Sequence, residues 1–385
     1  MIIGIDASNI RAGGGLAHLI KLLNTGNPLN LGFSRVIIWG GQNTLDKIVD
    51  RPWLTKSHQK QLDKGLFNRV FWQRFKLSTL ARKAGCAVLF VPGGSYVGNF
   101  RPVVTLSQNL LPFQWYELRR YFLSIMTVKL LLLRLSQGHS FRRADGVIFL
   151  THYAYDTIMS IINHSTAKTT IIPHGADETF LCNPRQQFDM GCYSFEKPLK
   201  ILYVSIIDMY KHQWNVVDAV AQLRAYGLPI TLSLVGPAYS PALKRLRKYL
   251  EHIDKHAEFI NYVGEVPYEQ LPRCYAQADL FLFASTCENM PIILLEAMAS
   301  GLPIACSKFG PMPEILGDAG VYFDPEKPKD IAVALRRLLD SPALRASIAK
   351  ASFERARDYS WLSSVELTYD FLYKCARNNP LLQKS

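Results

Sequence analysis

The chain has 385 residues, of which 49% are hydrophobic and 19% are charged. This apolar content excludes wholesale disorder, and the length favours two domains of ordinary size. The most apolar long stretch, residues 121–136, contains Lys129 and Arg134, so it does not predict a membrane-spanning helix. The opening residues 1–6 contain no basic group and predict a strand rather than a signal peptide.

The formal net charge is +13, and it is concentrated in one part of the chain. Residues 51–150 contain sixteen Lys and Arg but only three Asp and Glu, whereas the rest of the chain contains both signs in equal numbers. Such a concentration of positive charge indicates an acidic partner. That partner could be a phosphate-bearing substrate, an anionic lipid surface or a nucleic acid.

Short apolar runs alternate with helical patterns along the chain. Six runs in the first half predict strands at 2–6, 36–39, 88–91, 103–106, 147–150 and 169–172. Six more predict strands at 201–204, 230–235, 259–263, 280–284, 303–306 and 320–323. This alternation predicts parallel sheets with helices on both faces. The fold class we expect is α/β, with two doubly wound, Rossmann-like domains that face each other across a ligand-binding cleft.

An irregular stretch between the two series of strands sets the expected domain boundaries. We predict an N-terminal domain at 1–180, a linker at 181–199 and a C-terminal domain at 200–358.

Several kinds of site are absent from the sequence. The seven cysteines form no C-x-x-C pair, which favours reduced thiols in the cytoplasm, and no His/Cys cluster has the spacing of metal ligands. No D-x-D, P-loop or G-x-S-x-G motif occurs. Three classes of enzyme are therefore disfavoured: a metal-dependent transferase with a D-x-D motif, a P-loop enzyme and a serine hydrolase.

The segment 285–303 carries a pair of carboxylates. It follows a predicted strand, which places Glu288 in the loop beyond the carboxyl end of that strand. Pro291 suits the first turn of a helix, so Glu296 lies within this helix, some two turns past Glu288. Carboxylates placed in this way could accept hydrogen bonds from sugar or ribose hydroxyls. Taken alone, the pair is more simply explained as a solvated helix residue and an incidental loop charge.

The context changes this interpretation, because the segment closely resembles the donor-site motif of the retaining glycosyltransferases of family four, the glycosyl transferases group one, which have the GT-B fold. Glu288 and Glu296 match its E-x7-E pair. Similar motifs follow in the family's order at 171–177, 202–219, 234–237, 263–267 and 271–279. Residues 359–361 resemble the start of the family's closing helix, so we expect 359–385 to return toward the N-terminal domain. The resemblance is specific over about 169–361 and thinner before it.

The resemblance implies a site for a nucleotide diphosphate sugar in the C-terminal domain. We expect Glu296 on the ribose hydroxyls, Lys211 on the diphosphate leaving group and Glu288 on the transferred sugar, with Glu288 and Lys211 as the catalytic residues. The implied site contains no metal and no cofactor besides the donor substrate. Further donor contacts are expected from Asn289, Met290, Pro291, Gly236, Pro237, Gly264 and Val266.

Lys211 follows a predicted strand at the start of a helix, where an ammonium group and a helix N-terminus both favour a diphosphate. Without the motif, a solvated loop lysine would be the simpler explanation. Family members commonly carry an arginine a few residues earlier, but residues 205–210 contain none. Lys211 is therefore expected to act either with the first glycine loop or with an arginine from elsewhere in the chain.

Gly14 and Gly15 belong to a glycine triplet after the first strand, whose backbone N–H groups could approach the donor. An isolated triplet would more simply be a flexible turn, but the family places a donor-facing loop here.

Two further loops provide acceptor-side candidates. In similar transferases a histidine in the loop after the strand at 103–106 often contacts the donor sugar, whereas this chain has two amides there. An Asn-rich turn explains these amides equally well. The loop after the strand at 88–91 is a weaker candidate for acceptor contact. The residues concerned are Gln108, Asn109, Gly93 and Gly94.

We therefore expect a retaining, metal-independent glycosyltransferase that moves a sugar from a nucleotide diphosphate to a saccharide or lipid-linked saccharide, in the synthesis of a cell-surface polysaccharide such as lipopolysaccharide. Two alternatives stay open. One is another enzyme on the same fold, a nucleotide-sugar epimerase or a phosphorylase. The other is a nucleic-acid-binding protein that uses Phe71, Trp72 and Phe75 among the basic residues of 51–150.

The basic segment also predicts peripheral binding to the anionic inner face of the cell membrane, where each Lys or Arg contributes about 1 kcal/mol. On a helix over 117–136, basic side chains could reach lipid phosphates while leucines contact acyl chains. A core helix with its charges at solvent is slightly favoured for this helix alone, whereas the charge count favours the membrane. The apolar stripe of the helix would contain Tyr121, Ile125, Val128, Leu132 and Leu135.

Overall fold

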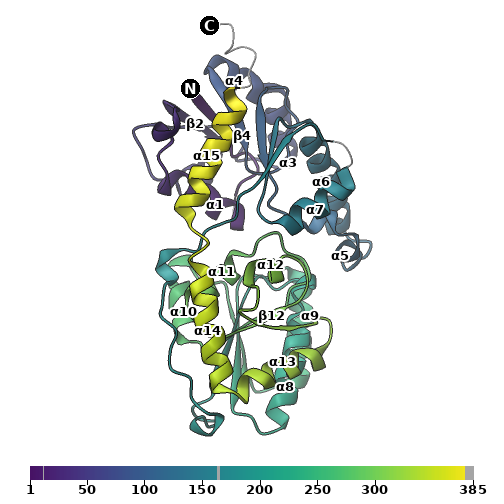
Figure 1. The fold of residues 1–385 in the computed structure, drawn as a ribbon. Helices are drawn as coiled ribbons and strands as arrows, with labels where there is room; N and C mark the ends of the chain where they lie inside the picture. Colours follow the sequence, from purple (N-terminus) through teal and green to yellow (C-terminus); the bar gives the residue numbers. More distant parts are fainter. Residues whose placement is uncertain (12, 163–164, 378–385) are drawn as a thin grey trace. The chain divides into compact units, whose positions relative to one another are not determined.

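The computed structural model describes residues 1–11, 13–162 and 165–377 and divides into two compact units (Figure 1). The first unit comprises 1–118, 122–175 and the chain from 360 onward, and the second comprises 119–121 and 176–359. The division falls after Gly175 rather than after residue 180, and the predicted linker lies inside the second unit. The short segment Arg119–Tyr121 also belongs to the second unit, which the sequence did not indicate.

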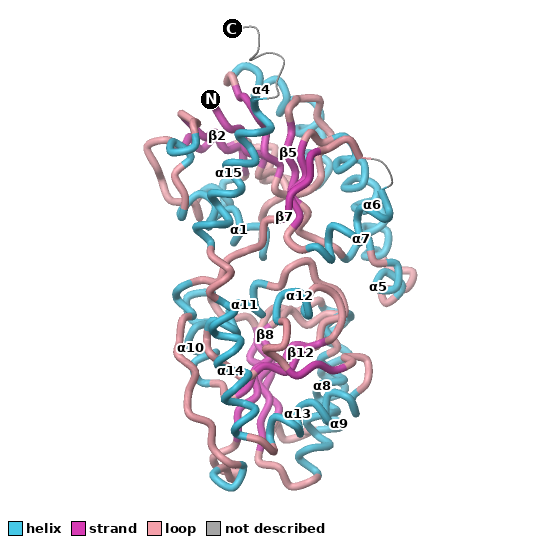
Figure 2. The backbone as a smooth tube through the Cα atoms, viewed as in Figure 1, coloured by secondary structure: helices cyan, strands magenta, loops and turns pink. Residues whose placement is uncertain are grey.

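The first unit is built on a seven-stranded parallel sheet in the order β3-β2-β1-β4-β5-β6-β7 (Figure 2). Its core is apolar, and Val88, Leu89 and Phe90 of the central strand β4 are fully buried. The strands are β1 (Ile2–Asp6), β2 (Arg35–Gly40), β3 (Leu54–His58), β4 (Cys86–Val91), β5 (Val103–Leu106), β6 (Gly146–Phe149) and β7 (Lys168–Ile171).

Helices cover both faces of this sheet. The last one, α15 (Trp361–Arg377), packs against α1 and β4, and the Tyr369 hydroxyl donates to the Leu22 carbonyl at 3.1 Å. Residues 378–385, the end of the predicted closing helix, lie outside the described residues. The other helices are α1 (Gly13–Thr25), α2 (Gln42–Leu45), α3 (Leu66–Trp72), α4 (Ser78–Lys83), α5 (Trp115–Arg119), α6 (Ile125–Arg143) and α7 (His152–Ile162).

The second unit is built on a six-stranded parallel sheet in the order β10-β9-β8-β11-β12-β13. The strands are β8 (Leu199–Val204), β9 (Ile230–Val235), β10 (Ile260–Gly264), β11 (Leu280–Phe283), β12 (Ile304–Ser307) and β13 (Val321–Phe323). The helices are α8 (Gln213–Ala225), α9 (Ser240–Ile253), α10 (Leu271–Gln277), α11 (Ile292–Ala299), α12 (Met312–Leu316), α13 (Pro328–Leu339) and α14 (Pro342–Ala356).

The twelve predicted strands are all present, with ends within two residues of the prediction. The sequence pattern does not predict β3, because Leu54-Thr-Lys-Ser-His58 contains no apolar run. β3 is the edge strand of its sheet and pairs only with β2, from Val36↔Leu54 to Gly40↔His58. An edge strand can be polar because one of its sides faces solvent.

The predicted helix over 117–136 is wrong as a continuous element. The chain leaves α5 at Arg119, passes through Phe122 with a φ of 50°, and starts α6 at Ile125 with Ser124 as the N-cap. Tyr121 is buried in the second unit and does not belong to the apolar stripe. The rest of the stripe is exposed: Ile125 is 90% and Leu135 70% accessible. The interpretation of this stripe as a core contact is therefore also wrong.

Candidate active site

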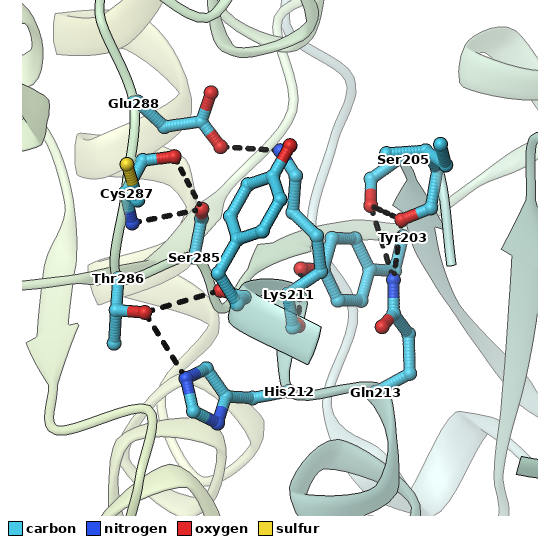
Figure 3. A network of polar contacts seen from close by, with 11 residues as sticks. Tyr203, Ser205, Lys211, His212, Gln213, Ser285, Thr286, Cys287 and Glu288 are labelled. Atoms are coloured by element: carbon cyan, nitrogen blue, oxygen red, sulfur yellow. Dashed lines mark hydrogen bonds and ion pairs between the residues drawn. The ribbon is translucent and has the colours of Figure 1, made fainter. Parts of the chain in front are cut away.

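In the second sheet, the chain order reverses between β8 and β11, which lie side by side. The loops at the carboxyl ends of these two strands diverge, and this is the position at which doubly wound sheets bind ligands. Lys211 is in the loop after β8, and Glu288 is in the loop after β11. Their side chains form an ion pair, Lys211 Nζ to Glu288 Oε1 (Figure 3). The fold thus brings together the two predicted catalytic residues, which are 77 positions apart in sequence.

Lys211 is buried, so the alternative explanation of this residue as a solvated loop lysine is wrong. The side chains of Lys211 and Glu288 are 5% and 13% accessible. The ammonium also lies 5.0 Å from the ring centroids of both Tyr210 and Phe283. Each charge therefore depends on the other, because an unpaired charge in such a place is costly.

Hydrogen bonds connect the loop after β8 to the loop after β11. His212, which has a φ of 50°, places its Nε2 3.2 Å from Thr286 Oγ1, and Thr286 donates its backbone N–H to the Tyr210 carbonyl at 3.0 Å. Tyr203 donates its hydroxyl to the Lys211 carbonyl at 2.6 Å. Burial lowers the pKa of His212 to about 4, so this imidazole is neutral near pH 7. Figure 3 shows these contacts on both sides of Lys211.

Where the family commonly has an arginine, this loop carries an acidic residue. Asp208 caps the turn Met209–Lys211 and accepts a hydrogen bond from the Tyr121 hydroxyl at 2.8 Å. Next to Tyr121, Arg120 forms an ion pair with Glu326. Sequence analysis did not identify Arg120 or Tyr121 as site residues. Nothing in the linear pattern links a residue near 120 to a loop near 210.

The predicted nucleotide loops adjoin this region. Gly236, with a φ of 142°, donates its N–H to the Gly264 carbonyl at 2.8 Å. A Cβ on Gly236 would lie 2.2 Å from the Ser205 carbonyl oxygen, so only glycine fits there. Pro237 accepts a backbone hydrogen bond from Ile207 at 2.8 Å. Val266 is half-buried in the loop after β10.

Glu296 is on α11 and is 1% exposed. Burial raises the pKa of its carboxyl to about 7, although the Tyr275 hydroxyl donates a hydrogen bond to Oε2 at 2.9 Å. Tyr268 interacts with Glu296 and donates its hydroxyl to Asp177 Oδ2 at 3.0 Å. The sequence motifs assigned no role to Asp177, Tyr268 or Tyr275. Asp177 and Tyr275 lie in motifs that resemble the family, and Tyr268 lies just after the motif at 263–267.

Asn289, Met290 and Pro291 connect Glu288 to α11. All three are buried, and Pro291 is the N-cap of the helix and accepts the Leu294 N–H at 3.0 Å. Gly301, with a φ of 60°, follows the end of the helix, where the left-handed conformation favours glycine. The loop between Glu288 and the helix is therefore short and held by packing.

In the first unit, the predicted glycine loop is helical, because Gly13, Gly14 and Gly15 form the first turn of α1. A Cβ on Gly15 would lie 2.8 Å from Gln108 Oε1, so the fold brings Gly15 and Gln108 together. Nε2 of Gln108 is buried and has no hydrogen-bond partner within the described ranges. A buried amide of this kind can donate a hydrogen bond to a ligand hydroxyl.

The other acceptor-side candidates have structural contacts. Asn109 Oδ1 accepts the Leu111 N–H at 3.1 Å. A Cβ on Gly93 would lie 3.2 Å from Asn9, and one on Gly94 would lie 2.9 Å from Gln137 Nε2. Close packing therefore accounts for both glycines, and a turn accounts for part of Asn109.

Two histidines that sequence analysis did not place in the site lie near these loops. His18 and His174 are buried with their Nδ1 atoms 3.3 Å apart, and Trp361 lies against both rings. Burial lowers the pKa of His18 to about 4, and that of His174 well below its usual value. Burial therefore favours the neutral form of both rings, and a neutral pair can form one hydrogen bond between the two Nδ1 atoms.

The match to a known family lies in the second unit. The family model described as glycosyl transferases group 1 matches residues 191–355, the stretch that carries Lys211, Glu288 and Glu296. The stretch that matches this family model contains Glu288 and Glu296, the E-x7-E pair on which the resemblance was based.

Curated relatives match this chain over shorter stretches. The O-antigen chain mannosyltransferase B of Escherichia coli is 35% identical over 103 residues, which are 27% of this chain and 27% of the relative. The stretch that matches thus spans about a quarter of that protein's length.

Solved structures match the whole fold. A sucrose-phosphate synthase from Thermosynechococcus elongatus has a TM-score of 0.77 at 20% identity, and the match covers 100% of both chains. Anabaena Alr3699/HepE in complex with UDP-glucose has a TM-score of 0.69 at 16% identity and covers 97% of this chain and 100% of its own. The fold of the chain is GT-B, as the resemblance in the sequence implied.

Within the described residues, no helix is both long and apolar enough to cross a membrane.

Proposed function

We propose that the protein is a retaining, metal-independent glycosyltransferase that uses a nucleotide diphosphate sugar as donor. The observation that carries this proposal is the buried Lys211–Glu288 pair at the chain reversal between β8 and β11. A cation and a carboxylate at this position supply the two groups that the transfer needs, one for the leaving diphosphate and one for the sugar.

The proposed mechanism uses an exchange of partners. In the free protein Glu288 neutralises Lys211; when the donor binds, the diphosphate becomes the partner of Lys211 and the carboxylate of Glu288 turns to the sugar hydroxyls. The bond between the anomeric carbon and the diphosphate then breaks, and the negative charge on the departing oxygen is met by the ammonium. The acceptor hydroxyl bonds to the anomeric carbon on the same face and gives its proton to the departing phosphate. Neither step requires a metal ion.

Glu296 is proposed to bind the ribose. Its carboxylate is buried beside two tyrosine hydroxyls, and a ribose hydroxyl that donates to it would favour the ionised form. The structure of Anabaena Alr3699/HepE contains UDP-glucose, which supports a nucleotide sugar as the kind of donor.

Calorimetry on two variants separates the roles of the glutamates. Glu296→Gln is expected to weaken the binding of both UDP and a UDP-sugar, because the ribose is common to both ligands. Glu288→Gln is expected to leave UDP binding within about threefold and to reduce turnover by about a hundredfold or more. The reverse pattern would exchange the two roles, and equal losses of UDP affinity would refute the distinction.

Arg120 is our candidate for the second cation on the diphosphate. Its neighbour Tyr121 is hydrogen-bonded to Asp208, in the loop that lacks the usual arginine. Burial is the largest cause of the lowered pKa of His212, and the positive charge of Arg120 is the second cause. Arg120→Ala should weaken UDP binding about tenfold, as expected for a charge-assisted hydrogen bond, whereas Arg119→Ala should not. Equal affinities in the two variants would reject Arg120.

The acceptor that we propose is a saccharide or lipid-linked saccharide of a cell-surface polysaccharide such as lipopolysaccharide, used at the inner, cytoplasmic face of the membrane. The E. coli relative is an O-antigen chain mannosyltransferase, and the charge of +13 is concentrated in residues 51–150. Transfer assays with extracted lipid-linked saccharides should give labelled product. Label recovered only in water-soluble saccharides would exclude a lipid-linked acceptor while leaving the donor site valid.

A further inference from the structure

A cavity of about 570 Å³ lies in the first unit, away from the loops that hold Gly15 and Gln108. Its lining includes Arg101 and Val103, where β5 begins, and Arg143, where α6 ends before β6. The cavity is therefore at the amino edge of the sheet, whereas Gly15 and Gln108 follow the carboxyl ends of β1 and β5.

The cavity is lined by three arginines and a histidine. These are Arg74, Arg101, Arg143 and His139, and no Asp or Glu is among the lining residues. Arg101 is paired with Asp145 at 2.7 Å. Arg74 and Arg143 have no carboxylate partner in the part of the chain that the structure describes. Two guanidinium groups without counter-ions make the cavity suited to a phosphate group.

An exposed aromatic stripe, called the α3 stripe below, borders the cavity on α3 and on the π-helical turn Gln73–Leu77 that continues it. Phe67, Phe71 and Phe75 follow each other at intervals of four residues and are 92%, 57% and 62% exposed. Val70 and Arg74, which are four residues apart and so lie on one face of the helix, both line the cavity. Large exposed aromatic side chains beside a basic site indicate a binding surface rather than ordinary surface composition.

A second apolar stripe, on α6, runs into the same cavity (Figure 1 shows both helices in the first unit). The exposed residues Ile125, Val128, Leu132 and Leu135 repeat at helical spacing, and this repeat continues to His139 and Arg143. The same face of α6 is thus apolar along its first turns and basic in its last turn, where it lines the cavity.

We propose that this cavity is a headgroup site for an anionic phospholipid, with the stripes of α3 and α6 in contact with the acyl region of the bilayer. The inference rests on the proposed membrane-surface transferase and locates its anchor. Arginines bind the lipid phosphate, aromatic side chains suit the level of the headgroups, and aliphatic ones suit acyl chains. The anchor is at the amino edge of the sheet, so it leaves the opposite edge, with Gly15 and Gln108, free for substrate.

The surface fits lipid better than single-stranded RNA. RNA-binding surfaces use open aromatic faces on which bases stack. Here the rings of Phe71 and Phe75 pack against each other, with their centroids 4.8 Å apart. The Cζ atom of Arg74 lies 5.6 Å from the centroid of the Phe75 ring. The stripe on α6 is aliphatic and offers no stacking surface at all.

The test is co-sedimentation of the full chain with vesicles of phosphatidylcholine alone and of phosphatidylcholine with phosphatidylglycerol. The double variant Arg74→Gln/Arg143→Gln removes two cations of the cavity. The matched control Lys60→Gln/Lys64→Gln removes two exposed cations of the same segment that do not line it. We expect the cavity variant to bind anionic vesicles about thirtyfold more weakly, about fivefold for each cation. The control should lose about threefold or less.

The aromatic stripe is tested by Phe67→Ser/Phe71→Ser, which should weaken binding to anionic vesicles at low and high salt alike, because the lost contact is apolar. Thermal unfolding should be unchanged in every variant, since the altered side chains are exposed.

Three results would overturn the headgroup site. Equal losses in the cavity variant and the lysine control would show diffuse attraction without a site. Equal binding of the wild type to both vesicle types would exclude selection of anionic lipid. Binding to RNA without binding to vesicles would assign the surface to nucleic acid. UDP binding is measured in parallel: if it is intact while vesicle binding fails, the anchor is refuted and the transferase is not.

Discussion

The second unit holds an ion pair in its interior at the carboxyl edge of its sheet, whereas burial disfavours charge at the same edge of the first unit. Lys211 and Glu288 form the buried pair of the second unit. In the first unit, burial raises the pKa of Asp6 and lowers that of His18, so it disfavours the charged form of each group. Three arginines of the first unit, Arg74, Arg101 and Arg143, instead line a cavity at the amino edge of the sheet.

This difference determines which kind of ligand each unit can bind. A buried ion pair can exchange partners with a charged donor, because each charge already needs a counter-ion. A neutral buried cluster binds hydroxyls but cannot hold a diphosphate. The exposed cations of the first unit are available to a surface at little cost to the fold.

Removing one member of the buried pair should have the largest effect on stability. Lys211→Ala leaves Glu288 buried without a counter-ion and should lower the free energy of unfolding of the second unit by about 3–5 kcal/mol. Lys211→Ala/Glu288→Ala should regain most of that loss. Urea unfolding measures both. A single variant within about 1 kcal/mol of the wild type would show that the pair is hydrated rather than buried.

Glu296→Gln should stabilise the second unit at alkaline pH. The folded pKa of about 7 exceeds the unfolded value of 4.5, so the wild type loses stability as pH rises from 4.5 through 7. The loss is about 3 kcal/mol relative to the variant, which has no charge to bury. The two proteins should be equally stable at pH 4.5 and diverge by pH 8. A constant difference across this range would contradict the raised pKa.

His18→Gln should show an effect of similar size and opposite sign in the first unit. The folded pKa of about 4 lies below the unfolded 6.5, so the wild type loses stability as pH falls from 6.5 toward 4. Relative to the variant, this loss is about 3 kcal/mol at pH 4. Thermal melts at pH 7.5 and below, with Lys60→Gln as a surface control, would measure it. Parallel pH curves would mean that His18 is solvated.

Tyr275→Phe should have the smallest effect. It removes one hydrogen bond to Glu296, at a cost of about 1 kcal/mol, and raises the pKa of the carboxyl further. UDP binding by the variant should therefore require higher pH than binding by the wild type. Titration in buffers of different ionisation enthalpy measures the proton released on binding. An unshifted pH profile would separate Glu296 from the nucleotide.

The linear pattern was sufficient for the fold class, and it named Lys211, Glu288 and Glu296 as candidates for the donor site. Strand runs such as 280–284 are apolar because they are buried on both faces, and the E-x7-E pair lies within one short segment. Where the signal is local, in an apolar run, a capping proline or a terminal glycine, the sequence alone carries it. The edge strand β3 was missed because its backbone pairing with β2, and no pattern of its own, makes it a strand.

The partners and protonation states of these residues depend on the tertiary structure. The pairing of Lys211 with Glu288, the raised pKa of Glu296 and the placement of Arg120 in the second unit all depend on contacts between distant segments. Charge, burial and hydrogen bonding are properties of a three-dimensional neighbourhood, so a sequence pattern can name an ionisable side chain without stating its partner. The same holds for the stripe on α6: its spacing is visible in the sequence, but packing alone decided that it faces solvent.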